Sequence, residues 1–180
     1  QWGLDHCMQA HIVYLSQTSN VKVGVTRKVN LPTRWHDQGA STALPIISTQ
    51  SRLHAGMIEV MLSKHMADKT NWRKMLTQQA QAINLHEYAG KIIQATDLRK
   101  YISMEPQWQE QIPKIIFNEQ QQETIQYPIL EYPSKITSHN PEKNPSIHGK
   151  LIGIKGQYLI LSTGVINIRK YAGYKVDFTY

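Results

Sequence analysis

Two polar side chains flank a glycine in an apolar stretch near the start of the chain. Tyr14 and Lys22 lie in two short runs, residues 12–15 and 21–25, that are rich in Val, Ile and Tyr. These residue types favour β-strands, and the polar turn between the runs predicts a hairpin. Gly24 in the second strand lets another group approach the backbone closely. The hairpin therefore offers a phenol and an amine, two groups that take part in proton transfer, beside an open backbone position.

Three further residues with chemically useful side chains follow on predicted helices. Arg34 lies in a short helix predicted over residues 31–38. Glu59 lies at the margin of the apolar stripe of a longer helix, predicted over residues 52–66. Asn71 follows Glu59 by twelve positions. Mg²⁺ is usually held by one or two carboxylates plus water, so a single glutamate is chemically sufficient for a magnesium site.

The order and spacing of these segments resemble the opening of the GIY-YIG nucleases. The tripeptide IVY, which ends at Tyr14, stands where that family has its first tripeptide, and KVG, which begins at Lys22, stands where it has its second. Residues 30–35 look like the short helix that bears the family's arginine. Residues 59–71 look like the later helix that bears its glutamate, followed by its asparagine. The resemblance covers about residues 10–76.

Three segments, KVGVT, TRWHDQGA and DKTNWRKML, more narrowly resemble an uncharacterised bacterial family of unknown function. We identify that family as a divergent member of the GIY-YIG superfamily. The resemblance implies a metal-dependent endonuclease that acts on nucleic-acid phosphodiester bonds with Mg²⁺ or Mn²⁺ as cofactor.

The same resemblance implies a catalytic role for each of the five residues. Glu59 would hold the metal ion, and Arg34 would bind phosphate oxygens in a bidentate manner. Tyr14 would act as general base or position the attacking water, if neighbouring cations such as Lys22 lower its pKa. Asn71 would order the site by hydrogen bonds.

The sequence departs from the family pattern at two supporting positions. Lys22 replaces the second tyrosine, and Val25 stands where a lysine is common; Arg27 and Lys28 are near enough to supply the lost charge. The alternative functions are a nucleic-acid-binding module with a decayed nuclease site and a structural or regulatory protein that uses the same cleft for another ligand.

Glu59 also has a purely structural interpretation. Arg52 lies on the same predicted helix, and Lys64 follows Glu59 by five positions. A solvated glutamate that pairs with one of these two cations is the alternative to a metal ligand.

The charge balance favours a polyanionic partner. Lys and Arg number 20 against 13 Asp and Glu, a net charge of +7. Such a surface favours nucleic acid through counterion release, and we expect DNA in preference to RNA. No apolar run is long enough to cross a membrane, and the first residues do not resemble a signal peptide, so we expect no membrane partner and a cytoplasmic protein.

A second set of basic residues lies in the C-terminal part, interleaved with tyrosines. We expect weak nucleic-acid contacts from these residues and from Arg27 and Lys28. The C-terminal set consists of Lys150, Lys155, Arg169 and Lys170. The alternative is a solvated sheet whose tyrosines fill the edge of its core.

The only cysteine, Cys7, excludes a disulfide within the chain. The first residue is Gln, so we expect the sequence to be a fragment or a processed form. The family it resembles often has further cysteines upstream, which makes Cys7 a candidate for the last Zn²⁺ ligand of an upstream module. A small, partly buried cysteine near a terminus is the alternative.

The predicted fold class is α+β. We expect a tail over residues 1–9, and a GIY-YIG-like domain over residues 10–84 with a small three-stranded sheet and flanking helices. A helical connector over residues 85–123 and a small C-terminal β-meander or barrel over residues 124–180 follow.

The sequence also makes finer predictions about single elements. A third strand over residues 43–49 should lie at a sheet edge or begin late, because it contains Pro45. A solvated helix is expected within residues 107–126, with Trp108 and Ile112 among its inward-facing residues. The C-terminal strands are predicted at residues 147–154, 157–162, 165–169 and 174–178, the last pairing with residues 124–131.

Overall fold

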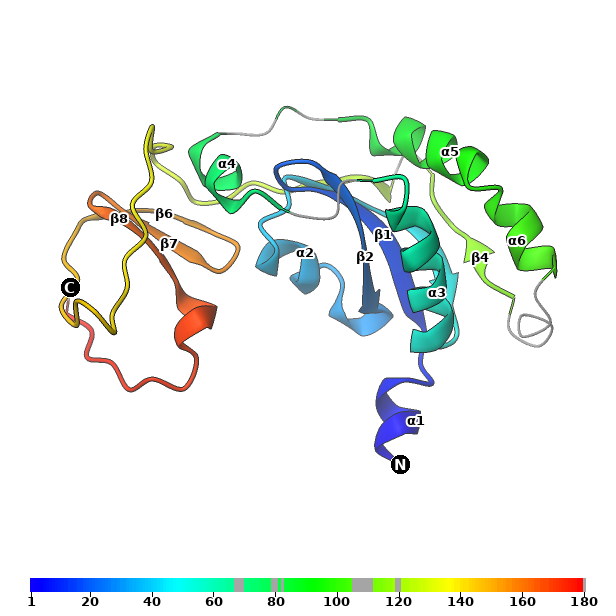
Figure 1. Cartoon of the computed structure of the whole chain (residues 1–180), viewed down its shortest axis with the longest axis horizontal. Helices are drawn as coiled ribbons and strands as arrows, with labels where there is room; N and C mark the ends of the chain where they lie inside the picture. Colours follow the sequence, from blue (N-terminus) through cyan, green and yellow to red (C-terminus); the bar gives the residue numbers. More distant parts are fainter. Residues whose placement is uncertain (67–69, 79–80, 82, 105–111, 119–120, 180) are drawn as a thin grey trace.

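An antiparallel sheet carries the N-terminal part of the chain. The structure is a computed structural model that describes residues 1–66, 70–78, 81, 83–104, 112–118 and 121–179. The strands run in the order β2-β1-β3-β4, and β5 also pairs with β3 (Figure 1). Their bounds are β1 His11–Gln17, β2 Val21–Arg27, β3 Thr42–Thr49, β4 Lys114–Ile115 and β5 Glu123–Thr124.

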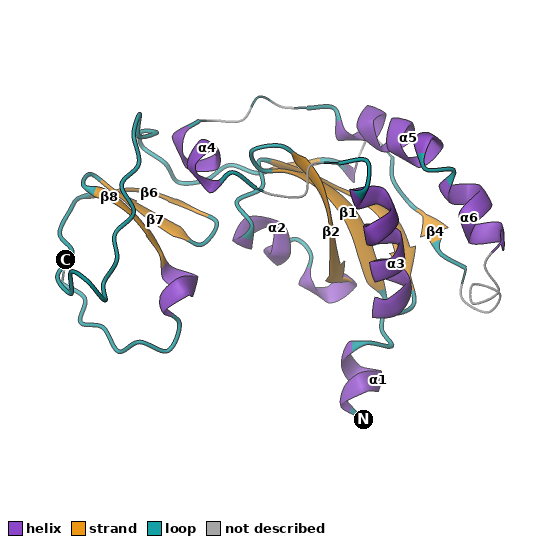
Figure 2. Ribbon diagram, viewed as in Figure 1, coloured by secondary structure: helices purple, strands orange, loops and turns teal. Residues whose placement is uncertain are grey.

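Helices and a second, smaller sheet complete the fold, which is α+β as predicted (Figure 2). The helical elements are α1 Trp2–His6, η1 Lys28–Asn30, α2 Thr33–Asp37, α3 Arg52–Ser63, α4 Trp72–Thr77, α5 Leu85–Ala95, α6 Leu98–Met104 and η4 Ile168–Tyr171. The second sheet has the order β6-β7-β8, with bounds β6 Leu151–Lys155, β7 Tyr158–Leu161 and β8 Gly164–Asn167. Within the described ranges, no helix has the length and apolarity that a membrane span requires.

The predicted hairpin forms, and its register places Tyr14 opposite Gly24. Alternate residues of β1 point to opposite faces of the sheet. Val13 belongs to a core that includes residues of α3 and α5. Ile12 and Tyr14 belong to a second core together with Trp35 of α2. The sheet thus separates two cores, and Tyr14 lies in the core that α2 covers.

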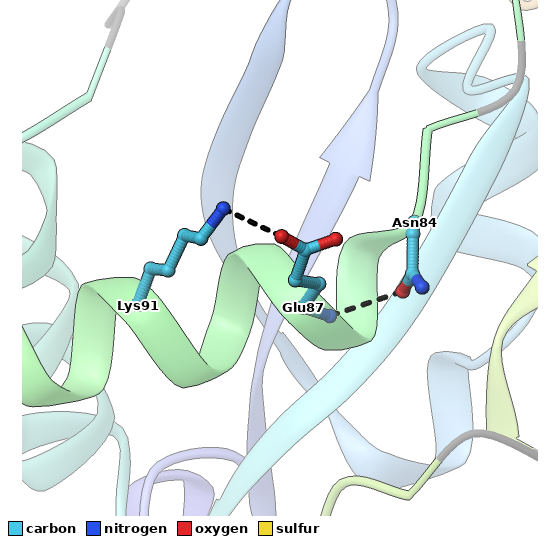
Figure 3. A network of polar contacts seen from close by, with 3 residues as sticks. All are labelled: Asn84, Glu87 and Lys91. Atoms are coloured by element: carbon cyan, nitrogen blue, oxygen red, sulfur yellow. Dashed lines mark hydrogen bonds and ion pairs between the residues drawn. The ribbon is translucent and has the colours of Figure 1, made fainter.

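Side-chain caps begin three of the α-helices, α3, α4 and α5. The Ser51 hydroxyl accepts a hydrogen bond from the His54 amide at 3.3 Å and starts α3, as the sequence predicts. Asn84 starts α5 by accepting from the Glu87 amide at 3.0 Å, and Glu87 pairs with Lys91 one turn later at 2.6 Å (Figure 3). Such caps satisfy amide groups that have no partner within the helix.

The helix α4 joins the two sheets. Met75 and Leu76 of α4 form a third core with Ile160 of β7 and Val165 of β8. The ring of Trp72 stacks on that of Tyr158, with centroids 5.7 Å apart. The C-terminal sheet is therefore packed onto a helix that follows directly after Asn71.

Several finer predictions are wrong. β3 does not lie at an edge, because β1 pairs with it on one side and β4 and β5 on the other. Pro45 is tolerated because it lies next to a register shift in the β1 pairing, at a position that neither short outer strand reaches.

The segment predicted as a solvated helix contains β4 and β5 instead. Ile112 is exposed, and Trp108 lies outside the described residues. Residues 174–178 form no strand, and the expected pairing of this segment with residues 124–131 is wrong, since β5 pairs with β3 and Ile129 bridges to Gly153. β4 and β5 escape sequence prediction because strands of two residues carry no periodicity and depend on the neighbour they pair with.

Candidate functional site

Tyr14 is fully buried, and its ring fills the space above Gly24. A β-carbon on Gly24 would lie 2.6 Å from the Tyr14 hydroxyl oxygen and 2.7 Å from Cζ. The ring also meets Trp35 edge-on, with centroids 6.0 Å apart. The glycine of the KVG tripeptide is thus required by the tyrosine of the IVY tripeptide, because any side chain would displace the ring.

Gln38 joins Tyr14 to Arg34. The Gln38 amide lies 3.0 Å from the Tyr14 hydroxyl. When its oxygen faces Arg34, that oxygen accepts from Nε at 3.2 Å and from Nη2 at 3.3 Å. The amide nitrogen then donates to the Tyr14 hydroxyl. Sequence reasoning missed Gln38, although its position four residues after Arg34 on a helix indicates that the two side chains share a face.

Burial raises the pKa of the Tyr14 hydroxyl above its ordinary value. The positive charge of Arg34 and the hydrogen bonds from Arg34 and Gln38 act in the opposite direction but are weaker. The expected lowering of this pKa by Lys22 is therefore wrong. Tyr14 is therefore a neutral phenol near neutral pH, and Gln38 connects it to Arg34.

Lys22 is half-buried on β2 and donates a hydrogen bond to the Thr70 hydroxyl at 3.0 Å. Burial is the main reason for the lowered pKa of its ammonium group, and the charge of Arg34 adds to the effect. Lys22 and Arg34 are therefore within electrostatic reach of each other, and two neighbouring cations attract anions such as phosphate.

Glu59 lies on α3 with 32% of its side chain exposed. Of the groups that shift the pKa of Tyr14, Glu59 has the smallest effect, and its negative charge raises that pKa. The Arg52 guanidinium is 4.0 Å away, and half of the Arg52 side chain is exposed. This ion pair is long and solvated, which makes it weak. This ion pair corresponds to the structural interpretation of Glu59, with Arg52 as its partner.

Asn71 caps α4. Its side-chain oxygen accepts from the Lys74 backbone amide at 3.1 Å, and its own backbone amide donates to the Ser19 hydroxyl at 2.8 Å. Thr70, which binds Lys22, is the residue before it. Asn71 therefore acts on the site by fixing the loop that holds Lys22.

Electrostatic coupling links four of the five predicted residues. Tyr14 is influenced by Arg34 and Glu59, and Lys22 by Arg34, while Asn71 is connected through Thr70. Among the described residues, no group of three or more His, Cys, Asp or Glu could hold a metal ion. The donor set fits a hard cation held by Glu59, water and substrate oxygens, and it does not fit a zinc site.

The family comparison covers nearly the whole chain. A family described as "Protein of unknown function (DUF2797)" matches residues 1–176. The chain belongs to this family. No curated protein and no solved structure matches it.

The six basic residues that the sequence predicts as nucleic-acid contacts of this DUF2797 protein occupy different environments. Lys28, Lys150, Arg169 and Lys170 are exposed, and Arg27 is half-buried. Lys155 is only 1% exposed, so it does not belong to the accessible basic surface on which its expected role rested. Cys7 is a free, partly buried cysteine.

Lys155 lies between two tyrosine rings at the junction of the C-terminal sheet and α2. Its ammonium nitrogen is 5.5 Å from the Tyr127 ring centroid and 5.4 Å from that of Tyr132. The Tyr127 hydroxyl lies 3.0 Å from the Ala40 carbonyl oxygen and 3.3 Å from that of His36, at the end of α2. This junction fixes the helix that carries Arg34 and Gln38.

The burial of Lys155 predicts a specific pH dependence. Burial lowers its pKa in the folded protein below the ordinary 10.5. Between these two values the unfolded chain binds more protons than the folded chain, so the free energy of unfolding rises with pH. Below the folded pKa both states are protonated and the dependence vanishes.

We therefore expect the unfolding free energy of the wild type, relative to Lys155→Met, to increase as pH approaches 10.5. Urea denaturation at several pH values from 7 to 10 measures this difference. The neighbouring tyrosines are present in both proteins, so their titration largely cancels. Lys150→Met, at an exposed lysine, is the control and should give a flat difference. If the difference in unfolding free energy between the wild type and Lys155→Met also stays constant with pH, the ammonium group of Lys155 is not shielded from water.

Proposed function

We propose that this protein is a metal-dependent endonuclease of the GIY-YIG type that cleaves phosphodiester bonds of nucleic acid, DNA in preference to RNA. The observation that carries this proposal is the hydrogen-bonded link from Tyr14 through Gln38 to Arg34. Lys22 is within electrostatic reach of Arg34, and Glu59 is within electrostatic reach of Tyr14. A carboxylate and two cations brought together suit a metal ion and a phosphate group. The net charge of +7 supports a polyanionic substrate, and the lone cysteine is compatible with a cytoplasmic protein.

Three residues would bind the metal ion and the phosphate or hold the site in place. Glu59 would hold Mg²⁺ or Mn²⁺, which when bound polarises the phosphate and stabilises the leaving oxygen. Arg34 would donate to non-bridging phosphate oxygens, because its guanidinium is held by Gln38 and indirectly by Tyr14. Asn71 keeps the Thr70 loop in place beside Lys22.

Lys22 would accept the proton of the attacking water. Tyr14 is buried and has a raised pKa, so it is unsuited to the task. Lys22 is half-buried and has a lowered pKa. A lowered pKa means that Lys22 releases its proton more readily than an ordinary lysine, and a deprotonated lysine amine can act as general base. Lys22 would thus replace the second family tyrosine in function as well as in position.

Lys22→Arg tests this role. Arginine keeps the positive charge but does not release its proton, so it removes the base and leaves the anion site. We expect Mg²⁺-dependent cleavage to fall by about 10²–10⁴-fold, the usual contribution of general acid–base catalysis. DNA binding, measured by fluorescence anisotropy, should change little. Lys28→Arg at an exposed position is the control. Cleavage within twofold of the wild type would mean that Lys22 acts only through its charge.

A nucleic-acid-binding module with a decayed site is the second candidate function. The complete burial of Tyr14 favours it, because the phenol cannot touch a substrate without a rearrangement of Gln38. This candidate predicts salt-dependent DNA binding without cleavage in Mg²⁺ or Mn²⁺. It also predicts that Lys22→Tyr combined with Val25→Lys restores cleavage.

A further inference from the structure

A hollow of about 470 Å³ lies where the C-terminal sheet meets the end of α2. Ile154 and Ile168, which line it, are 40% and 49% exposed. Two large apolar side chains that face water in the same hollow indicate a surface that is covered in another state of the protein. The candidate site described above does not account for this hollow.

An aromatic ring at the hollow is fixed from behind. Tyr158 lines the hollow, and Trp72 stacks on it with an angle of 8° between the ring planes. The Arg73 guanidinium in turn lies 4.3 Å from the centre of the Trp72 ring. The Tyr158 ring is thus held in place and needs no ordering when a planar ligand packs there.

Three polar side chains accompany the apolar floor. Arg169 offers a guanidinium, Asp37 a carboxylate and Gln157 an amide. A guanidinium binds phosphate, while a carboxylate and an amide pair with amino and carbonyl groups at the edge of a nucleobase. An apolar floor, a fixed aromatic ring, one cation and two edge-pairing groups together match a nucleotide.

We propose that this hollow binds one unpaired nucleotide of the substrate, with its base over the apolar floor and its phosphate on Arg169. The base must be unpaired because a base inside a duplex is stacked and cannot enter. Asp37 follows Arg34 by three residues on α2, a rise of about 4.5 Å along the helix axis. The hollow is therefore a few nucleotides at most from the phosphate bound by Arg34.

This placement next to the cleaved bond rests on the proposed function. It predicts a substrate with a single-stranded or unpaired position beside the scissile phosphate. The binding of an unpaired nucleotide in the hollow does not require cleavage.

Anisotropy titrations in EDTA with the full chain test the proposal without any cleavage. The probes are a fluorescein-labelled single-stranded 12-mer DNA and the blunt duplex of the same sequence. We expect the wild type to bind the single strand more tightly. Arg169→Ala and Ile168→Asp, both at exposed positions, should each weaken single-strand binding about tenfold or more and affect duplex binding less. Lys143→Ala, at an exposed lysine away from the hollow, is the control and should lose less than threefold.

The outcomes separate this inference from the proposed function. Equal losses for Arg169→Ala and Lys143→Ala, or equal affinity for both probes, would overturn the nucleotide site. Cleavage of a blunt duplex that is unaffected by Arg169→Ala would retain the nuclease and reject the placement of the hollow beside the cleaved bond. A selective loss in Arg169→Ala and Ile168→Asp, in a protein that cleaves nothing, would retain the site and reject the nuclease.

Discussion

Replacing Glu59 by glutamine is expected to reduce Mg²⁺-dependent cleavage by on the order of 10³-fold or more, because the metal stabilises the transition state by several kcal/mol. Glutamine keeps the shape of the side chain and removes the charge that holds the cation. DNA binding in EDTA should stay similar or become slightly tighter, since a carboxylate near phosphate is repulsive without a metal. A nicking assay across a range of Mg²⁺ concentrations measures the effect.

Glu87→Gln is the matched control for this experiment. Glu87 is an exposed glutamate on α5 that pairs with Lys91, so the substitution also removes one carboxylate from a helix (Figure 3). Cleavage should stay at the wild-type rate in this control. If Glu59→Gln cleaves as fast as Glu87→Gln, the activity belongs to other residues or to a contaminant.

A methyl group at Gly24 is expected to damage stability and activity together. In Gly24→Ala the new β-carbon would lie 2.6 Å from the Tyr14 hydroxyl oxygen, in a core where the ring has no room to move. Overpacking of this kind costs about 1–3 kcal/mol. Because Tyr14 holds Gln38 and Arg34, its displacement should also lower cleavage and phosphate binding. Urea denaturation and the nicking assay measure the two effects.

Gly90→Ala is the control that separates the clash with Tyr14 from the effect that a glycine-to-alanine change has by itself. Gly90 lies on an exposed part of α5, and no atom comes within 4 Å of the position of its missing β-carbon. Alanine there should stabilise the protein by about 0.5–1 kcal/mol through its higher helix propensity. If Gly24→Ala is as stable as the wild type, the close packing of Tyr14 on β2 is wrong.

The sequence predicts those parts of the fold that depend on local signals. The hairpin follows from two β-branched runs and a polar turn, and α3 follows from its apolar spacing and the Ser51 cap. The two-residue strands β4 and β5 follow from no local pattern. They form because these two segments lie beside β3 and pair with it.

The candidate site shows the same division. Spacing and resemblance identify Tyr14, Arg34 and Glu59 as candidate site residues, but they do not predict the pKa values of these side chains. Burial decides the direction in which the Tyr14 pKa shifts, and this burial depends on the packing of Trp35 and Gln38 around the ring. Lys155 is a similar case, because the tyrosines that bury it come from a segment more than twenty residues away in the sequence.

Anomalous diffraction from a crystal of the full chain soaked with Mn²⁺ tests the central claim most directly. The account predicts one peak about 2.0–2.3 Å from a Glu59 carboxylate oxygen, with Arg34 and Lys22 facing the same cleft. The same soak of Glu59→Gln should give no peak at this position. Absence of a peak at Glu59 in the wild type, with Mn²⁺ bound only elsewhere, would contradict a metal-dependent site built on this residue.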